Sequence, residues 1–143
     1  MLPGLFALIF ASAFAGAALY ANFVEQPARL ALDDSSMMRE WAPSDRRGFA
    51  LQAGLALLAA IAGLASYGET GDIRWLIGAL IALASWPYTF FIIVPLNNRL
   101  LAEASAPQAD ARVIVRDWGK LEWGLFVLAL SSAGVFAWTL ALT

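Results

Sequence analysis

Two stretches of this sequence place ionisable and amide side chains directly beside long apolar runs. In "YANFVEQPARL", residues 20–30, Glu25 and Arg29 follow such a run and stand four residues apart. This spacing puts both side chains on one helix face, so they can simply pair at the water boundary. Glu25 can instead turn inward, because ionisable residues in membrane helices usually face a cavity and pair there. In that second interpretation Glu25 is a candidate base or ligand anchor.

The later stretch "WPYTFFIIVPLNNRLL", residues 86–101, leaves similar alternatives open. Trp86 and Pro87 predict a kink in a membrane helix, which either serves packing or, with the aromatic residues that follow, forms the floor of a pocket for a flat ring. Asn97 and Asn98 point in different directions on a helix, so at most one should face a cavity. Arg99 either reaches the lipid phosphates or joins the same polar cluster.

The chain contains neither Cys nor His. Their absence excludes disulfides, thiol nucleophiles, zinc sites of the Cys/His type, His-ligated haem and Ser-His-Asp catalysis. Glu25 and Glu122 are too few to provide the six or so oxygen ligands that calcium or magnesium takes. We therefore expect no metal site, and no cofactor is evident. The net charge of -2, without runs of like charge, excludes nucleic acid as an expected partner.

Composition places these residues in a membrane protein. Hydrophobic residues make up 61% of the 143 residues and charged residues 14%, against about 45 to 50% and about 25% in soluble domains. Four apolar runs, about 2–24, 49–67, 75–96 and 123–142, are each long enough for a membrane helix of about 20 residues. The first run lacks a basic leader and is longer than a signal peptide core, so we expect a retained span. The sequence predicts a single membrane domain over 1–143 with loops at 25–48 and 97–122.

The basic residues predict the orientation of these spans. Eight of the nine basic residues fall in the two long loops, and Arg74 is the exception. Positive residues mark the cytoplasmic side, so both termini should lie outside and the long loops inside. We expect a multi-pass protein of the bacterial inner membrane, with lipid as a partner.

Small residues predict how the spans pack. The first run offers Ala7, Ala11 and Ala15 on one face and Ser12 and Gly16 on another, and membrane helices associate through such close contacts. These features predict an all-α, antiparallel four-helix bundle. Ser44, after Pro43, is the expected N-cap of the second span. The amphipathic pattern of residues 108–123 predicts that the fourth span begins with a helical extension.

Three segments, "YANFVEQPARL", "WPYTFFIIVPLNNRLL" and "RDWGKLEWG", with "REWAPSDRRG" after the first, occur in this order. Together they resemble the anthrone-oxygenase-like family of small four-helix membrane proteins over nearly the whole chain. The resemblance implies a four-helix bundle and the oxygenation of an anthrone to an anthraquinone without an evident metal or flavin. By position it points to Glu25, Pro27, Arg29, Trp86, Pro87, Pro95, Asn97 and Trp118.

The third segment departs from the family pattern. The family commonly has His and Arg where this chain has Glu122 and Leu125. Glu122 therefore either replaces the His as a base, or the family's reaction is lost. On this basis the candidate catalytic residues are Glu25 and Glu122, and the candidate substrate-binding residues are Asn22, Arg29, Trp86, Tyr88, Asn97, Arg99 and Trp118.

Two functional hypotheses follow. In the first, a flat aromatic or quinone-like ligand enters from the membrane, a glutamate removes a proton, and Asn97 with Arg99 stabilises the enolate that dioxygen attacks. In the second, the chain is a non-catalytic accessory or scaffold subunit whose polar end binds lipid or partner subunits. A transporter has less support, because the chain shows no internal repeat.

Overall fold

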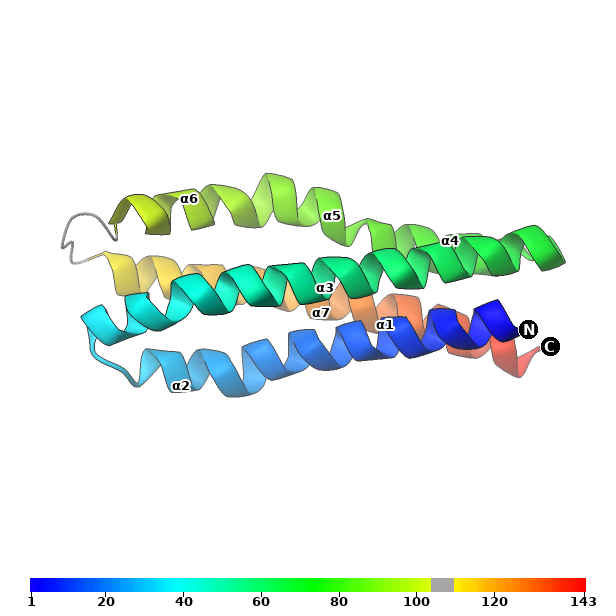
Figure 1. Cartoon of the computed structure of the whole chain (residues 1–143), viewed down its shortest axis with the longest axis horizontal. Helices are drawn as coiled ribbons and strands as arrows, with labels where there is room; N and C mark the ends of the chain where they lie inside the picture. The colour runs from blue at the N-terminus through cyan, green and yellow to red at the C-terminus, as the bar shows by residue number, and fades with distance from the viewer. Residues whose placement is uncertain (104–109) are drawn as a thin grey trace.

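A computed structural model describes residues 1–103 and 110–143, and every element in these ranges is helical. Four helical stretches, Leu2–Leu30, Asp34–Thr70, Ile73–Ala102 and Ala111–Ala141, are long and apolar enough to cross a membrane. They run antiparallel, with both termini at one end of the bundle (Figure 1). The all-α fold and the four spans confirm the prediction, and the chain is a multi-pass integral membrane protein.

The first and third spans are each interrupted close to a proline. The first consists of α1 (Leu2–Tyr20), the π-helical turn η1 (Ala21–Glu25) and α2 (Gln26–Leu30). The third consists of α4 (Ile73–Leu83), α5 (Ser85–Tyr88), the π-helical turn η2 (Thr89–Ile93) and α6 (Val94–Glu103). Each π-helical turn ends two residues before a proline, Pro27 or Pro95. A proline lacks the N–H for the carbonyl four residues earlier and its ring crowds that carbonyl, so the preceding turn widens.

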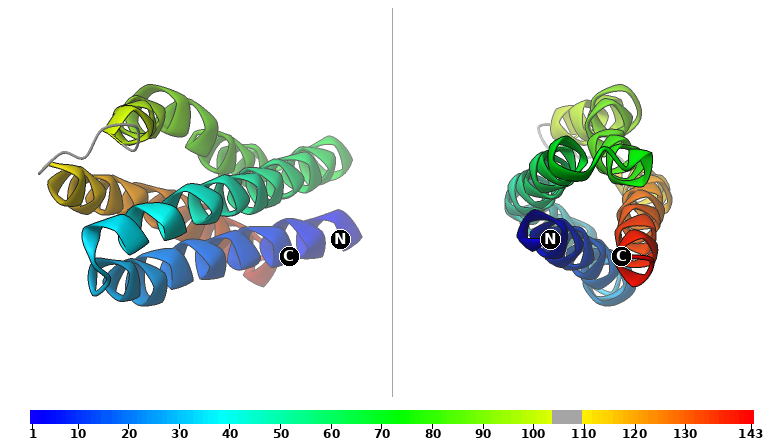
Figure 2. Two further views of the ribbon diagram at one scale, coloured as in Figure 1. Left: turned by 60° about the vertical axis from the view of Figure 1, so that its left-hand side comes forward. Right: turned by 90° about the vertical axis from the view of Figure 1, so that its right-hand side faces the viewer.

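Pro87 accounts for the break between α4 and α5. The helix α4 ends at Leu83, whose carbonyl would otherwise accept the missing N–H of residue 87. The hydroxyls of Ser85 and Thr89 donate to the carbonyls of Ala82 and Ser85 at 2.7 and 2.8 Å, as side chains commonly do around a proline in a membrane helix. Beyond this break, α5 and α6 diverge from α3 (Figures 1 and 2).

The second span is one continuous helix, α3 (Asp34–Thr70), and its N-cap is Asp33. The Asp33 carboxylate accepts the backbone N–H of Ser36 at 3.3 Å, and hydrogen bonds from the hydroxyl and N–H of Ser36 lower the pKa of Asp33. The prediction of Ser44 as the N-cap was therefore wrong. Met37 and Trp41 are fully buried before Pro43, and this packing offsets the hydrogen bond that the proline removes.

The fourth span, α7 (Ala111–Ala141), includes the predicted helical extension. Ile114, Trp118 and Leu125 are buried along it. At about 1.5 Å per residue, the 37 residues of α3 extend about 55 Å and the 31 residues of α7 about 45 Å. Both helices therefore extend past a hydrocarbon layer of about 30 Å.

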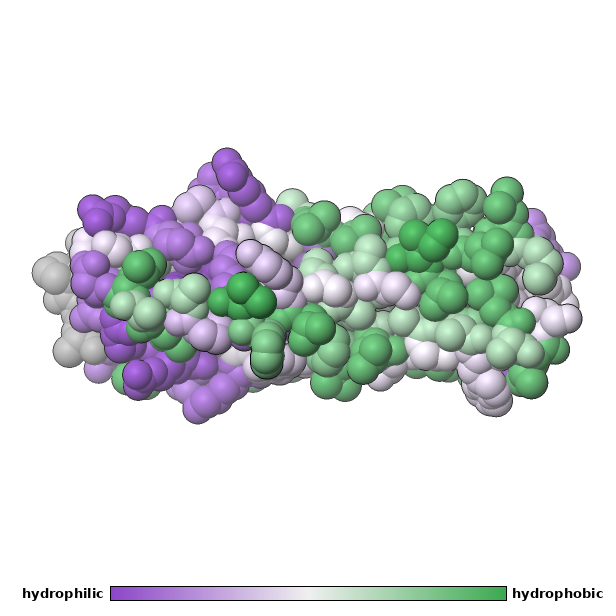
Figure 3. Space-filling view, turned by 90° about the horizontal axis from the view of Figure 1, so that it is seen from below, coloured by the Kyte–Doolittle hydropathy of each residue, from purple (hydrophilic) through white to green (hydrophobic). Residues whose placement is uncertain are grey.

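The bundle packs through small residues at the end that carries the termini. Ala7, Ala11 and Ala15 are buried, whereas Ser12 and Gly16 are exposed. The ring of Phe136 fills the space beside Gly63 and Gly78, where an added Cβ would meet it within 3.0 Å. Figure 3 shows a hydrophobic surface at this end and a hydrophilic surface at the opposite end.

Candidate functional site

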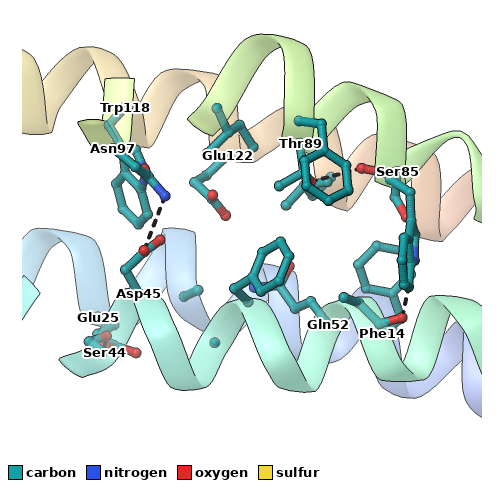
Figure 4. A pocket seen from close by; sticks show the side chains of 18 of the residues that line it. Phe14, Glu25, Ser44, Asp45, Gln52, Ser85, Thr89, Asn97, Trp118 and Glu122 are labelled. Carbon is teal, nitrogen blue, oxygen red and sulfur yellow. Dashed lines mark hydrogen bonds between the residues drawn. The ribbon is translucent and has the colours of Figure 1, made fainter. Parts of the chain in front are cut away.

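A cavity lies where the third span diverges from α3, between α3, α5 to α6 and α7 (Figure 4). The space inside it that water-sized molecules can reach is about 50 Å³, and one water molecule needs about 10 to 15 Å³ on this measure. The first span closes the cavity from behind. Its lining comprises Phe14, Ala21, Glu25, Arg29, Ser44, Asp45, Gly48, Phe49, Gln52, Ala53, Ser85, Trp86, Thr89, Phe90, Ile93, Asn97, Trp118, Glu122 and Leu125.

One end of this cavity is aromatic and reaches the surface. Phe49 of α3, Trp86 of α5 and Phe90 of η2 line it, and their exposed fractions are 42%, 36% and 52%. The indole Nε1 of Trp86 donates to the carbonyl of Ala53 at 3.3 Å, so this tryptophan connects α5 to α3. These rings belong to apolar stretches of the second and third spans. This end of the cavity is therefore suited to a hydrophobic molecule that arrives from lipid.

The other end is acidic. The amide Nδ2 of Asn97 donates to Asp45 Oδ2 at 3.1 Å, and Glu122 is 6% exposed. Figure 4 shows Asp45 of α3 and Glu122 of α7 facing the same space. Within the described residues the Glu122 carboxylate has neither a hydrogen bond nor an ion pair, so its full hydrogen-bonding capacity is open to a ligand.

Three further polar atoms of the lining are buried without a partner among the described residues: Gln52 Oε1, Asn97 Oδ1 and Trp118 Nε1. Buried polar atoms normally have a partner. Two of these atoms are acceptors and one is a donor, so the lining offers hydrogen-bonding groups of both kinds to a bound molecule.

Each of the three nitrogens of Arg29 donates to a protein side chain. Its Nε donates to Glu40, its Nη1 donates to Gln26 Oε1 at 2.7 Å, and its Nη2 donates to Glu25 Oε1 at 3.1 Å and to Ser44 Oγ at 2.9 Å. The guanidinium also lies 5.2 Å from the centre of the Trp118 ring. Glu25 accepts the Ser44 hydroxyl as well. Although both ionised groups border the cavity, they are held together as one cluster that joins α2, α3 and α7.

The remaining predicted residues lie outside the lining of the cavity. Asn22 is buried and donates to the Ala18 carbonyl at 2.7 Å, while the Tyr88 hydroxyl donates to the Leu121 carbonyl at 2.6 Å. Neither residue belongs to the lining. Arg99 is exposed on α6 and is not part of the lining either, whereas its neighbour Asn97 is.

Sequence reasoning missed Asp45 as a site residue. Its signal is the spacing of Trp41, Asp45, Gly48 and Gln52, which follow one another at helical intervals of four, three and four. This pattern becomes visible only if the helix is assumed to continue through Pro43. A helix beginning after Ser44 places Asp45 at a frayed end, where a carboxylate is ordinary.

Within the described residues, no group of three or more carboxylates is placed to hold a metal ion.

A comparison with curated proteins and with solved structures found no match. The sequence model described as anthrone oxygenase, in contrast, matches residues 41–135. This range contains α3 from Trp41 onward, the whole third span and the cavity-lining part of α7, so the match includes most of the residues around the cavity. The chain belongs to the anthrone oxygenase family.

Proposed function

We propose that this membrane protein binds a flat aromatic or quinone-like molecule in the cavity and that Glu122 acts as a base toward it. The observation that carries the proposal is a buried, unpartnered carboxylate in a cavity whose other end is aromatic and open. Intramembrane carboxylates of this kind are usually functional. The family suggests the reaction, which is oxygenation of an anthrone-like carbon without a metal or flavin.

The reaction uses dioxygen as the oxidant. Glu122 removes one proton from the methylene carbon between two rings, which leaves a carbanion conjugated with the ring carbonyl. Dioxygen adds to this carbon, and the resulting hydroperoxide loses water to form a second carbonyl. One atom of dioxygen is thus in the ketone and the other in water, and the methylene carbon is oxidised.

The geometry suggests different partners for Glu122 from those expected from the sequence. Asn97 already donates to Asp45, and Arg99 is outside the lining. Trp118 Nε1 is a buried donor without a partner in the described residues, and it can stabilise the negative charge that develops on the carbonyl oxygen. Glu25 is held by Arg29 and Ser44, so it positions this cluster rather than taking the proton.

The test is dioxygen-dependent turnover of anthrone by the purified protein. Glu122→Gln should lower kcat by about a hundredfold, the usual contribution of a general base. Asp117→Asn on the exposed face of the same helix is the matched control and should retain wild-type turnover. Equal turnover by the wild type and Glu122→Gln would contradict the role of Glu122, as would equal turnover in solutions with and without protein.

A non-catalytic accessory subunit is the second candidate. Leu125 stands at the family's Arg position, and Gly16, Gly54 and Gly134 have open space beside them, as close contacts with a partner helix require. Native mass spectrometry after mild extraction from a bacterial inner membrane, the proposed location, separates the two candidates. A stoichiometric protein partner without a small molecule supports the accessory role, and a bound aromatic molecule supports the first proposal.

A further inference from the structure

The ionisable groups of the cavity are unbalanced in charge. Three carboxylates, Glu25, Asp45 and Glu122, line it together with one guanidinium, that of Arg29. Arg29 is already shared between Glu25 and Glu40. Within the described residues, Asp45 and Glu122 therefore have no basic side chain within ion-pair distance.

Two carboxylates that face one another in a closed space repel each other and lose hydration. They can share that space only if a proton or another positive charge joins them. Glu122 is 6% exposed, and Asp45 has the Asn97 amide as its hydrogen-bond donor. Neither contact supplies a full positive charge, so a cationic ligand can take the place of the shared proton.

A second, independent observation also indicates a ligand of this charge. Gln52 is 7% exposed and lines the cavity, yet its Oε1 has no partner in the described residues. Asn97 Oδ1 is unpartnered as well. Both atoms are acceptors that add negative potential beside the two carboxylates, and Figure 4 shows both side chains around the same space.

The aromatic end adds a preference for a hydrophobic ion. Phe49, Trp86 and Phe90 line the cavity and are also exposed at the surface. Aromatic faces attract organic cations, more strongly when water is excluded. A compact inorganic ion would gain little from these rings, whereas a cation covered with apolar groups would use both ends of the cavity.

We propose that the cavity is a binding site for a lipophilic organic cation, such as a hydrophobic amine or quaternary ammonium ion, with Asp45 and Glu122 as its counter-charges. This proposal uses the cavity of the proposed function but none of its chemistry. The cation can be the protein's ligand whether or not the chain oxidises an aromatic substrate.

The test is saturable binding of two ions of the same shape and opposite charge to the full chain in mild detergent. Tetraphenylphosphonium is the cation and tetraphenylborate the anion, and isothermal titration calorimetry gives both affinities. We expect the cation to bind at least about tenfold more tightly, the effect of one desolvated charge contact. Equal affinities, tighter binding of the anion, or no saturable binding of the cation would overturn the proposal.

Variants locate the site. Asp45→Asn and Glu122→Gln should each weaken tetraphenylphosphonium binding by about tenfold, with tetraphenylborate binding unchanged or stronger. Asp117→Asn, which removes an exposed carboxylate from α7, should leave both affinities unchanged. The same loss in all three variants would overturn the proposal, because it would reflect overall charge. Anthrone turnover is a separate measurement, so failure of the oxygenase proposal and failure of this one are distinguishable.

Discussion

At the scale of single residues, Arg29 illustrates how a charged group beside a cavity can be structural. It is 3% exposed, and each of its three nitrogens donates to a side chain. Its ion pairs join the end of the first span to α3, and its stacking on Trp118 adds α7. The group thus helps to hold three helices together, and a ligand would have to compete with those partners.

Removing this charge should cost substantial stability. Arg29→Met leaves Glu25 and Glu40 without their cation in a partly buried position, and we expect a loss of about 3 kcal/mol in the free energy of unfolding. Arg39→Met is the matched control, because Arg39 is exposed and donates to Ser36 Oγ at 3.2 Å. Denaturant unfolding of both variants in one detergent measures the difference. Equal losses in the two variants would rule out the structural role.

Gly124 leaves space for the Tyr88 ring, and substitution of this glycine tests how much that packing contributes to stability. A Cβ on Gly124 would overlap the Tyr88 hydroxyl, which is fixed by its bond to the Leu121 carbonyl. Gly124→Ala should therefore destabilise the protein by about 1 to 3 kcal/mol. Gly134 on the same helix has open space beside it, so Gly134→Ala should gain up to about 1 kcal/mol from helix propensity. Thermal unfolding followed by circular dichroism distinguishes these opposite signs.

At the scale of helices, the four spans were predictable because apolar runs of this length have few alternatives to helices in lipid. The effects of the prolines were only partly predictable. Pro87 breaks its helix as expected, whereas Pro43 lies inside α3 without ending it. The difference depends on tertiary packing, since Met37 and Trp41 are buried before Pro43. A linear sequence does not show which side chains will be buried, and for this reason Asp45 was not predicted as a site residue.

The break at Pro87 should set the width of the cavity. Pro87→Ala restores the N–H that can bond to the Leu83 carbonyl, so α4 and α5 can join and the third span can straighten toward α3. The natural chain has no Cys, so spin labels on Asn98→Cys and Arg46→Cys, both exposed positions, report one distance. Electron paramagnetic resonance should give a shorter distance in the Pro87→Ala background. An unchanged distance would mean that packing, and not the proline, holds the span apart.

At the scale of the whole molecule, the sequence predicted which residues would gather at one end but not which would meet. Glu25, Asn97 and Glu122 do border one cavity, because antiparallel spans bring the two long loops to the same side. Arg99 does not, although it is two residues from Asn97. Whether a residue of the third span faces the cavity depends on its angular position around the helix axis. The π-helical turn η2 and the break at Ala84 both change that angle for the residues that follow them.

The orientation in the membrane decides which compartment faces the acidic end of the cavity. Most of the basic side chains lie at the end opposite the termini, which predicts that this end is cytoplasmic. Gly68→Cys, near the turn between α3 and α4, and Ser35→Cys, at the start of α3, place single thiols at exposed sites on opposite ends. A membrane-impermeant maleimide should label Gly68→Cys in intact cells and Ser35→Cys only after permeabilisation. The reverse pattern would place Asp45 and Glu122 toward the outside, and their ligand would then meet these carboxylates from that side of the membrane.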